Sequence, residues 1–190
     1  MTSLRMFLIF AAIVLAALIV KPQGNLGHYE KEGLSFDYAN GWTVVDESNA
    51  DAQQLTLTKA NTDAKITVFV HRGKVDTPEK FAQAKKAFID PYVKSVNDRF
   101  VGWGAKPETS PATSEVGGAA AEGVRVRASL GGDAAEANIF WVALGTRVVV
   151  LTFFRPDDQL KPTMPGYDTI RTTIKVEPPP PRAAPTKKPV

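Results

Sequence analysis

Apolar and polar residues alternate along several short stretches of this chain, which is the pattern of half-buried β-strands. Before residue 75 the stretches are LSFDY, TVVD, QLTLTK and KITVFVHR, at residues 34–38, 43–46, 54–59 and 65–72. The turn dipeptide Asn40-Gly41 separates the first pair, and the loop ANTDA separates the second. The pattern predicts four strands here, the last two forming a hairpin.

Three further strands follow in quick succession after residue 120. They are EGVRVRASL, DAAEANIFWVAL and TRVVVLTFF, at residues 122–130, 133–144 and 146–154. Gly131-Gly132 and Gly145-Thr146 suit two-residue hairpin loops of type II′, so these strands predict an antiparallel meander. The stretch 104–118 is rich in turn residues and predicts a loop with at most a short strand.

Two other stretches have the period of an α-helix. In the first, Thr77 is placed to cap, Pro78 suits the first helical position and Glu79 favours the helix dipole. Pro91 interrupts this stretch and predicts a kink, or a second short helix capped by Asp90. The apolar stripes of the two helices are Phe81, Ala84, Phe88, Tyr92 and Val96, then Leu160, Met164, Tyr167, Ile170 and Ile174.

The strands at 139–144 and 148–154 are apolar on both faces, so both faces must be covered. Because no second run of strands is evident, the two helices are the available covers. The sequence therefore predicts an α+β fold, in which an antiparallel, meander-containing sheet is flanked by helices on both faces.

The N-terminus carries Arg5 and then an unbroken apolar run from Met6 to Val20. As a helix this run spans roughly 22 Å, which suits either a short membrane anchor or the apolar region of a signal peptide. The one small-x-small match for cleavage, ending at Ala16, lies inside the run. We therefore favour an uncleaved signal anchor over residues 1–21, with the rest of the chain on the extracytoplasmic side, over a cleaved signal.

The remaining organisation is a tether at 22–27, a domain at 28–177 and a proline-rich, basic, disordered tail at 178–190. The net charge of +3 comes from the two ends, because 18 basic and 20 acidic residues remain between 28 and 177. A nucleic-acid face needs clustered positive charge on the domain, so nucleic acid is not an expected partner. The absence of cysteine excludes disulfides, thiolate metal sites and a cysteine nucleophile.

The phrase GLSFDYANGW at 33–42 resembles an opening phrase of the PsbP/Mog1-like family. DTPEKF at 76–81 resembles the start of that family's main helix, and TRVVVLTFF followed by YDTIRTTIKVE is similar to its closing hairpin, helix and strand. The resemblance covers nearly all of 28–177 and implies that family's fold and an accessory or binding role. Ala39 stands where the family commonly has proline, and the N-terminus lacks the composition of a chloroplast transit peptide, so no photosystem role is carried over.

Two tryptophans are possible contact sites. Trp42 flanks a turn inside a strand pair, which favours a place in the core. Trp103 follows the first helix between Gly102 and Gly104, and it is our candidate for a partner-contact residue.

Arg125 and Arg127 share a strand face, which suits an acidic partner or an internal ion-pair ladder. The hairpin loops place Arg127 opposite Glu136 and Glu136 opposite Arg155, so we favour an exposed cross-strand ladder. His28, Glu30 and Glu32 share a strand face too, where a solvated edge is favoured over a metal site.

No nucleophile motif, phosphate loop or dinucleotide fingerprint occurs in the sequence, so we expect no enzyme, no catalytic residues and no cofactor or metal. The expected function is a non-catalytic, membrane-anchored accessory module that contacts a membrane-associated protein partner. The alternative is a cleaved, soluble ligand-binding protein of the cell envelope. An enzyme whose site is assembled across the sheet is the third possibility, with no motif behind it.

Overall fold

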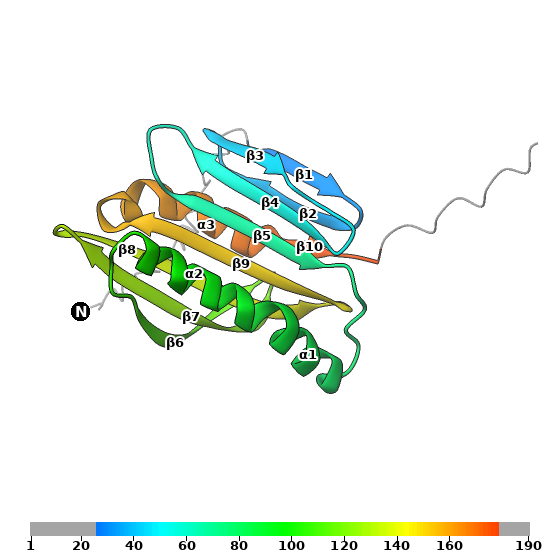
Figure 1. The fold of residues 1–190 in the computed structure, drawn as a ribbon. Coiled ribbons are helices and arrows are strands. Elements are labelled where there is room, and N and C mark those ends of the chain that lie inside the picture. The colour runs from blue at the N-terminus through cyan, green and yellow to red at the C-terminus, as the bar shows by residue number, and fades with distance from the viewer. Residues whose placement is uncertain (1–25, 179–190) are drawn as a thin grey trace, which may run out of the picture.

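The computed structural model describes residues 26–178, which form an α+β fold with a large antiparallel sheet, a small sheet and helices on both faces of the large one (Figure 1). The predicted anchor at 1–21, most of the tether and the tail after Pro178 lie outside the described residues. In the described range, no helix combines the length and the apolar character that a membrane crossing needs.

Seven strands make the large sheet, in the order β3-β4-β5-β9-β8-β7-β6. Neighbouring strands all pair antiparallel, and β5 and β9 are joined at the centre although they are far apart in sequence. The strands are β3 (Trp42–Asp46), β4 (Ala52–Lys59), β5 (Lys65–His71), β6 (Glu108–Val116), β7 (Ala119–Leu130), β8 (Asp133–Leu144) and β9 (Arg147–Pro156).

The predicted meander is present, and both of its loops have two residues, because Leu130 pairs with Asp133 and Leu144 with Arg147. One turn type was predicted wrongly. Gly131 and Gly132 have φ of 62° and 98°, and positive φ at both positions is the requirement of a type I′ turn, not a type II′ turn. Two glycines meet that requirement without steric cost.

The prediction of a loop with at most a short strand at 104–118 was wrong, because β6 is a nine-residue strand over most of that range. It lies at the edge of the sheet and is mostly exposed, so its sequence carries polar residues where a central strand would carry apolar ones. Val116, the last residue of β6, is buried in the core. Pairing with β7 along its whole length holds β6 in place.

The small sheet has the order β1-β2-β10 and consists of β1 (Gly27–Lys31), β2 (Leu34–Tyr38) and β10 (Lys175–Val176). The predicted turn at Asn40-Gly41 forms, with Gly41 at φ 83° and the Trp42 N–H donating to the Ala39 carbonyl at 3.3 Å. It does not close a hairpin. It carries the chain from β2 in the small sheet to β3 in the large one.

One continuous helical run covers one face of the large sheet. It consists of α1 (Pro78–Ala84), a π-helical turn η1 (Lys85–Ile89) and α2 (Asp90–Gly102). Thr77 caps α1 as predicted, since its Oγ1 accepts a hydrogen bond from the Lys80 N–H at 3.3 Å. Asp90 does not cap a second helix, because it lies inside the run and forms an ion pair with Lys85.

The π-helical turn changes which side chains face the sheet. It ends at Ile89, two residues before Pro91, which has no N–H to donate. The wider turn shifts the helical phase, so Ile89 is buried at 1% exposure, whereas Phe88 is 39% exposed. The predicted stripe was therefore wrong at Phe88 and right at Ala84, which is buried.

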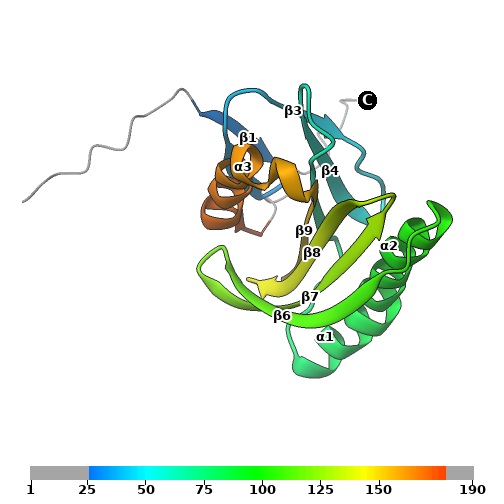
Figure 2. The same cartoon turned by 90° about the vertical axis from the view of Figure 1, so that its left-hand side faces the viewer.

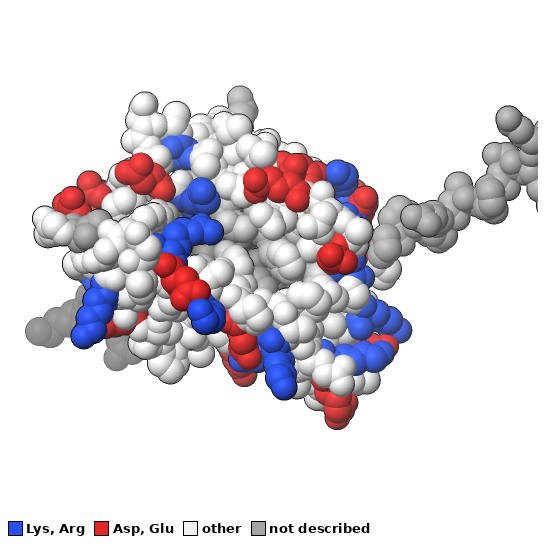
Figure 3. All heavy atoms as spheres, viewed as in Figure 1, with Lys and Arg blue, Asp and Glu red and all other residues white. Residues whose placement is uncertain are grey.

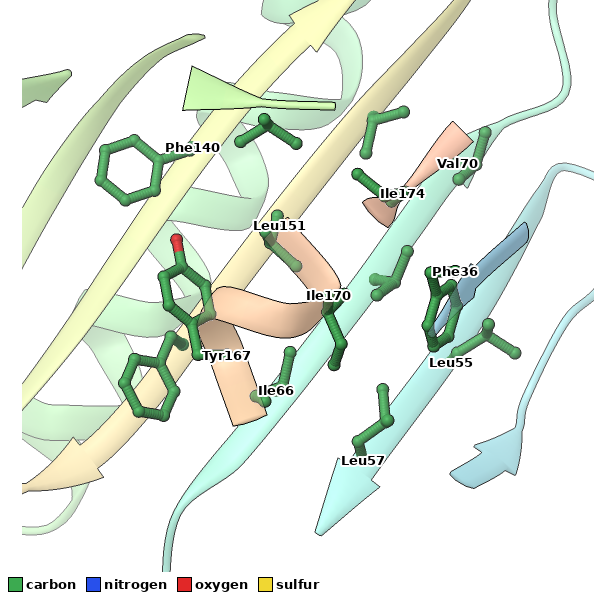
Figure 4. Close-up of a cluster of buried hydrophobic side chains, with 14 of the residues drawn as sticks. Phe36, Leu55, Leu57, Ile66, Val70, Phe140, Leu151, Tyr167, Ile170 and Ile174 are labelled. Atoms are coloured by element: carbon green, nitrogen blue, oxygen red, sulfur yellow. The ribbon is translucent and has the colours of Figure 1, made fainter. Parts of the chain in front are cut away.

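The opposite face is covered by α3 (Leu160–Thr173) together with the small sheet, so the two covers lie on opposite sides of the large sheet (Figure 2). A short 3₁₀ turn, η2 (Asp157–Gln159), leads into α3. Tyr167, Ile170 and Ile174 pack from this side against β5, β8 and β9 (Figure 4). The prediction of covers on both faces is confirmed, and part of the second cover is a sheet.

Trp42 is 6% exposed and belongs to this core, as predicted. Its indole lies against Gly166 of α3, so closely that a Cβ atom added at Gly166 would be 2.2 Å from Trp42 Nε1. Trp42 therefore fills the space between the sheet and the helix.

Candidate functional site

The described residues enclose a cleft of about 970 Å³ between α2, the start of β5 and the adjoining ends of β8 and β9. We call it the Trp103 cleft; its floor and walls include Tyr92, Phe100, Trp103 and Phe154. Figure 3 shows this face of the molecule, where a hollow lies beside α2 and charged side chains gather around it. Its volume is in the range of small-ligand sites and also fits a side chain of a partner.

The position of Trp103 is fixed by the end of α2. The Ala105 N–H donates to the Phe100 carbonyl at 3.0 Å and the Gly104 N–H to the Val101 carbonyl at 2.8 Å, which is the Schellman pattern. Gly104 has φ of 85°, a conformation that glycine adopts at no cost. Trp103 is therefore the C-cap residue of a helix, and its backbone is held by that helix.

The aromatic rings of the cleft contact each other at near-perpendicular or tilted angles. The Trp103 ring centroid lies 5.5 Å from that of Phe100 and 5.9 Å from that of Phe154. Phe100 is buried, whereas Trp103 is 51% exposed. Half of the indole is thus supported by the core and half is open to a partner, which is the arrangement expected of a contact residue.

Tyr92 closes the inner wall of the cleft. Its Oη donates to Thr152 Oγ1 at 3.0 Å, and burial raises the pKa of this phenol above its ordinary value. The side chains of Asp63 and Gln159 close one end, because Gln159 Oε1 accepts from the Asp63 N–H at 2.8 Å and Gln159 Nε2 donates to Asp63 Oδ2 at 3.3 Å. These contacts tie the β4–β5 loop to the start of α3.

The charged residues around the cleft are more acidic than basic. They are Asp63, Asp133, Asp157 and Asp158 against Lys65 and Arg99. Asp157 is already paired with Arg127 and with Arg155 Nη1, the latter at 3.0 Å. The lining is chemically complementary to an apolar or aromatic group with a positive charge nearby.

The predicted ladder has the predicted register, since Arg127 pairs with Glu136 and Glu136 with Arg155. It lies on the sheet face opposite the Trp103 cleft. The expectation that it is exposed was wrong for two members, because Glu136 and Arg155 are 5% and 6% exposed. α3 covers part of that face, so the Glu136–Arg155 contact at 3.1 Å is a buried ion pair.

His28 was placed at a solvated strand edge, and it pairs there with Asp37 through Nδ1 at 2.7 Å. The hydrogen bond that His28 donates to Asp37 raises the pKa of His28 above its ordinary value, although the side chain stays exposed. Among residues 26–178, no group of three or more histidine, aspartate or glutamate side chains is placed to hold a metal ion.

The sequence offered Trp103 as a candidate contact residue but did not predict the cleft around it. Tyr92 was assigned to a core stripe, and Phe154 to a two-sided apolar strand. Strand alternation could have placed Thr152 and Phe154 on one face. The meeting of that face with the end of α2 depends on tertiary packing that no local pattern reports.

No protein-family model matches the chain, and no curated protein matches its sequence. Among solved structures, it is similar to cyanobacterial PsbP from Synechocystis, with 17% identity, a TM-score of 0.52, and coverage of 86% of this chain and 99% of that one. A second is LpqN of Mycobacterium tuberculosis, involved in cell envelope biogenesis, with 16% identity, a TM-score of 0.44, and coverage of 80% of this chain and 90% of that one. A third is a Bacteroides thetaiotaomicron protein, with 12% identity, a TM-score of 0.49, and coverage of 79% of this chain and 48% of that one.

The similarity to cyanobacterial PsbP extends over the whole of that chain, and it concerns the arrangement of the elements. The resemblance stated from the sequence phrases is confirmed at the level of the fold. The chain has the PsbP/Mog1-like fold.

Proposed function

We propose that this protein is a non-catalytic accessory module, anchored in a membrane by residues 1–21, whose domain lies on the extracytoplasmic side and contacts a membrane-associated protein through the Trp103 cleft. The anchor rests on Arg5 followed by the apolar run Met6–Val20, with no cleavage site after the run. An anchor confines the domain to the membrane surface, which raises its effective concentration near membrane partners.

The observation that carries the contact role is the half-exposed indole of Trp103 on a floor of Phe100 and Phe154. A large rigid side chain held by a helix cap loses little conformational entropy on binding. The partner segment that fits is one with an apolar or aromatic side chain next to lysine or arginine, because the surrounding charge is mainly acidic.

Site-specific photo-cross-linking in native membranes tests this proposal. A photo-reactive phenylalanine analogue is placed at Ala134, which lines the cleft, in the full-length chain. We expect a discrete adduct with a membrane protein, reduced about tenfold or more by Trp103→Ala, since loss of an anchoring aromatic costs about 2 kcal/mol or more at an interface. Trp103→Phe should retain part of the adduct.

Val101→Ala is the matched control, because Val101 is 57% exposed on the same helix end but does not line the cleft. It should change the adduct less than about twofold, as expected for a neutral rim contact. An adduct that persists in Trp103→Ala, or that Val101→Ala removes equally, would show that partners bind elsewhere. Near-ultraviolet circular dichroism confirms that each variant is folded.

A further inference from the structure

A second cleft lies on the other face of the large sheet, between α3 and the strands β6 to β9. We call it the α3 cleft; its volume is about 530 Å³, and its walls include Arg125, Asn138, Phe140, Arg155, Met164 and Tyr167. This volume lies within the range of sites for small organic molecules. The strands β6–β9 curve around this side, with α3 facing them (Figure 2).

Two buried polar groups in the walls of this cleft have no hydrogen-bond partner among the described residues. They are Tyr167 Oη and Arg155 Nε, on residues that are 3% and 6% exposed. Figure 4 shows the Tyr167 hydroxyl directed toward Phe140, which also lines the cleft. Because unpaired buried polar groups are rare and costly, two of them on residues that line one cleft indicate a place where a ligand supplies the partner.

The electrostatics of the cleft favour an anion with a single charge. In the strand wall of the cleft, Arg125 and Arg155 share the single carboxylate of Glu136, so one positive charge is left over. Arg127 and Asp157, which pair with each other, do not line the cleft, and neither does Glu108, which is exposed opposite Arg127.

Two further charged side chains of α3 and one of β6 do not change this balance. Arg171 and Asp168 pair with each other at 3.2 Å. Glu115 contributes its carbonyl oxygen, which accepts from Arg171 Nη1 at 2.8 Å. Strand alternation directs the Glu115 side chain away from the face that carries the buried Val116, which packs in the core on the α3 side.

Arg125 is the arginine with freedom to turn toward a ligand. Its side chain is 54% exposed, and its contacts with Asn138 Oδ1 and Glu136 Oε1 are long, at 3.4 and 3.5 Å. Arg155 and Arg127 are held by shorter contacts to Asp157. An anion beside Arg155 Nε can therefore recruit Arg125 without breaking the buried ion pair.

The apolar part of the cleft lies next to these polar groups. Phe140 is 7% exposed, Met164 is partly buried, and Tyr167 is stacked on Phe153 with ring centroids 4.7 Å apart. Burial also raises the pKa of Tyr167, so its hydroxyl keeps its proton and can donate to an anionic oxygen.

We propose that the α3 cleft binds the carboxylate form of a small organic acid with an apolar body, which accepts hydrogen bonds from Arg155 Nε, Arg125 and Tyr167 Oη. A carboxylate matches the single excess charge and accepts on two oxygens, and planar guanidinium groups recognise it well. The apolar body packs on Phe140 and Met164. This inference does not depend on the membrane anchor or on the Trp103 cleft.

Calorimetric titration of the full chain in lipid nanodiscs tests the proposal, with empty nanodiscs as the blank. The probes are 4-phenylbutyrate and the matched uncharged 4-phenylbutanol. We expect the carboxylate to bind at least about tenfold more tightly than the alcohol, because charge-assisted hydrogen bonds are roughly twice as strong as neutral ones. Equal affinities of the two probes would overturn the proposal.

Arg125→Gln should weaken 4-phenylbutyrate binding about tenfold. Arg99→Gln makes the same charge change on the opposite face and should alter it less than about twofold. Equal effects of the two variants would show general charge attraction, and no effect of Arg125→Gln would place the carboxylate elsewhere; either result overturns the proposal.

Tyr167→Phe separates a ligand contact from a structural hydroxyl. It should weaken the binding of 4-phenylbutyrate about fivefold without lowering Tm, since the hydroxyl has no partner in the free protein. Tyr92→Phe is the comparison, because it breaks a hydrogen bond to Thr152 and should lower Tm by about 2–4 °C. A Tm loss in Tyr167→Phe as large as in Tyr92→Phe would overturn the proposal.

Discussion

At the scale of single residues, Gly166 decides how closely α3 approaches the large sheet, because the indole of Trp42 occupies the space where a Cβ atom would lie. Glycine inside a helix lowers helix stability by about 1 kcal/mol relative to alanine. The gain at this position is the close contact between α3 and β3, which brings the buried Tyr167 and Ile170 onto the sheet.

Gly166→Ala should therefore destabilise the protein, although alanine is the better helix former. The added methyl group would lie 2.2 Å from Trp42 Nε1, so the helix or the indole must move. We expect a loss of about 1–3 kcal/mol in the free energy of unfolding, measured by urea denaturation followed by tryptophan fluorescence.

Gly102→Ala is the control for this substitution. Gly102 is also helical, but nothing lies within 4 Å of an added Cβ atom, so this change should be neutral or stabilising by up to about 1 kcal/mol. If both variants are equally stable, the contact between Trp42 and Gly166 does not position α3.

Residues were predictable where local chemistry decides their place. Trp42 followed from a turn and an alternating strand, and Thr77 from the cap pattern. Phe88 was misplaced because a π-helical turn shifts the helical phase by one residue, and its only local signal is Pro91. Arg147 was also missed: it is 7% exposed and donates from Nη1 to the Glu32 carbonyl at 3.0 Å, a contact that exists only once both sheets are assembled.

At the scale of elements, Asp46 joins the small sheet to the large one. It lies at the end of β3 and accepts hydrogen bonds from Lys31 Nζ at 2.8 Å and Tyr29 Oη at 3.2 Å, both on β1. Lys31, and then the Ser48 N–H and side chain, hold the pKa of Asp46 well below its ordinary value. Burial and the same carboxylate raise the pKa of Tyr29 to about 12.

The contact between β1 and β3 should weaken in acid. A carboxyl group whose pKa is lower in the folded than in the unfolded protein stabilises the fold above its unfolded pKa of about 3.9, and this contribution is lost as pH falls through the folded pKa. The difference in unfolding free energy between the wild type and Asp46→Asn should thus be largest near pH 7 and shrink below about pH 4. Urea denaturation at pH 7, 4 and 2.5 measures it.

Asp98→Asn provides the comparison, because Asp98 pairs with Lys94 on an exposed helix surface. At pH 7 the unfolding free energy of Asp98→Asn should differ from that of the wild type by less than about 0.5 kcal/mol. A constant difference for Asp46→Asn across the three pH values would mean that its charge contributes nothing and that only the shape of the side chain matters.

Elements were predictable when their sequence alternation and turns agreed. The hairpin of β4 and β5 and the meander of β7, β8 and β9 were read correctly, including the register of Arg127, Glu136 and Arg155. β6 was not, because an exposed edge strand buries little and so keeps a polar sequence. The separation of β2 from β3 was missed too, since a turn signal fixes a reversal of the chain but not the partner strand.

At the scale of the whole molecule, two apolar faces on the central strands required two covers, and that reasoning found the architecture. The same reasoning did not predict the two clefts. The Trp103 cleft is built from α2, β5, β8, β9 and the turn before α3, and the α3 cleft from the opposite faces of β8 and β9. Successive residues of β8 and β9 point to opposite faces of the sheet and so line different clefts. Each cleft is therefore formed by every second residue of a strand, and these residues come together only when the strands pair and the helices pack.

Fractionation of expressing cells with intact-mass measurement tests the anchor. The uncleaved chain has a mass of 20.6 kDa and should be found in the membrane fraction, because the run Met6–Val20 is retained. Carbonate washing, which strips peripheral proteins, should leave it there.

A soluble protein that lacks roughly the first 16 to 26 residues would contradict the anchor and support a released, ligand-binding protein. In that case the α3 cleft would become the main site of interest. Replacing Ala12 and Leu15 by lysine in the full chain serves as the control, since charges in the apolar run should prevent membrane retention.

The small sheet also determines how the domain responds to pulling. β1 and β10 both pair antiparallel with β2, so they run parallel to each other; β1 begins opposite Tyr38, and β10 ends opposite Leu34. A force applied between the start of β1 and the end of β10 would act along these strands and load their hydrogen bonds in shear, all at once. The two-residue ladder of β10, extended by the Glu177 N–H to the Gly33 carbonyl, is the shorter one and would yield first. Its rupture would leave β1 and the large sheet intact, so β10 would detach under force before the rest of the domain unfolds.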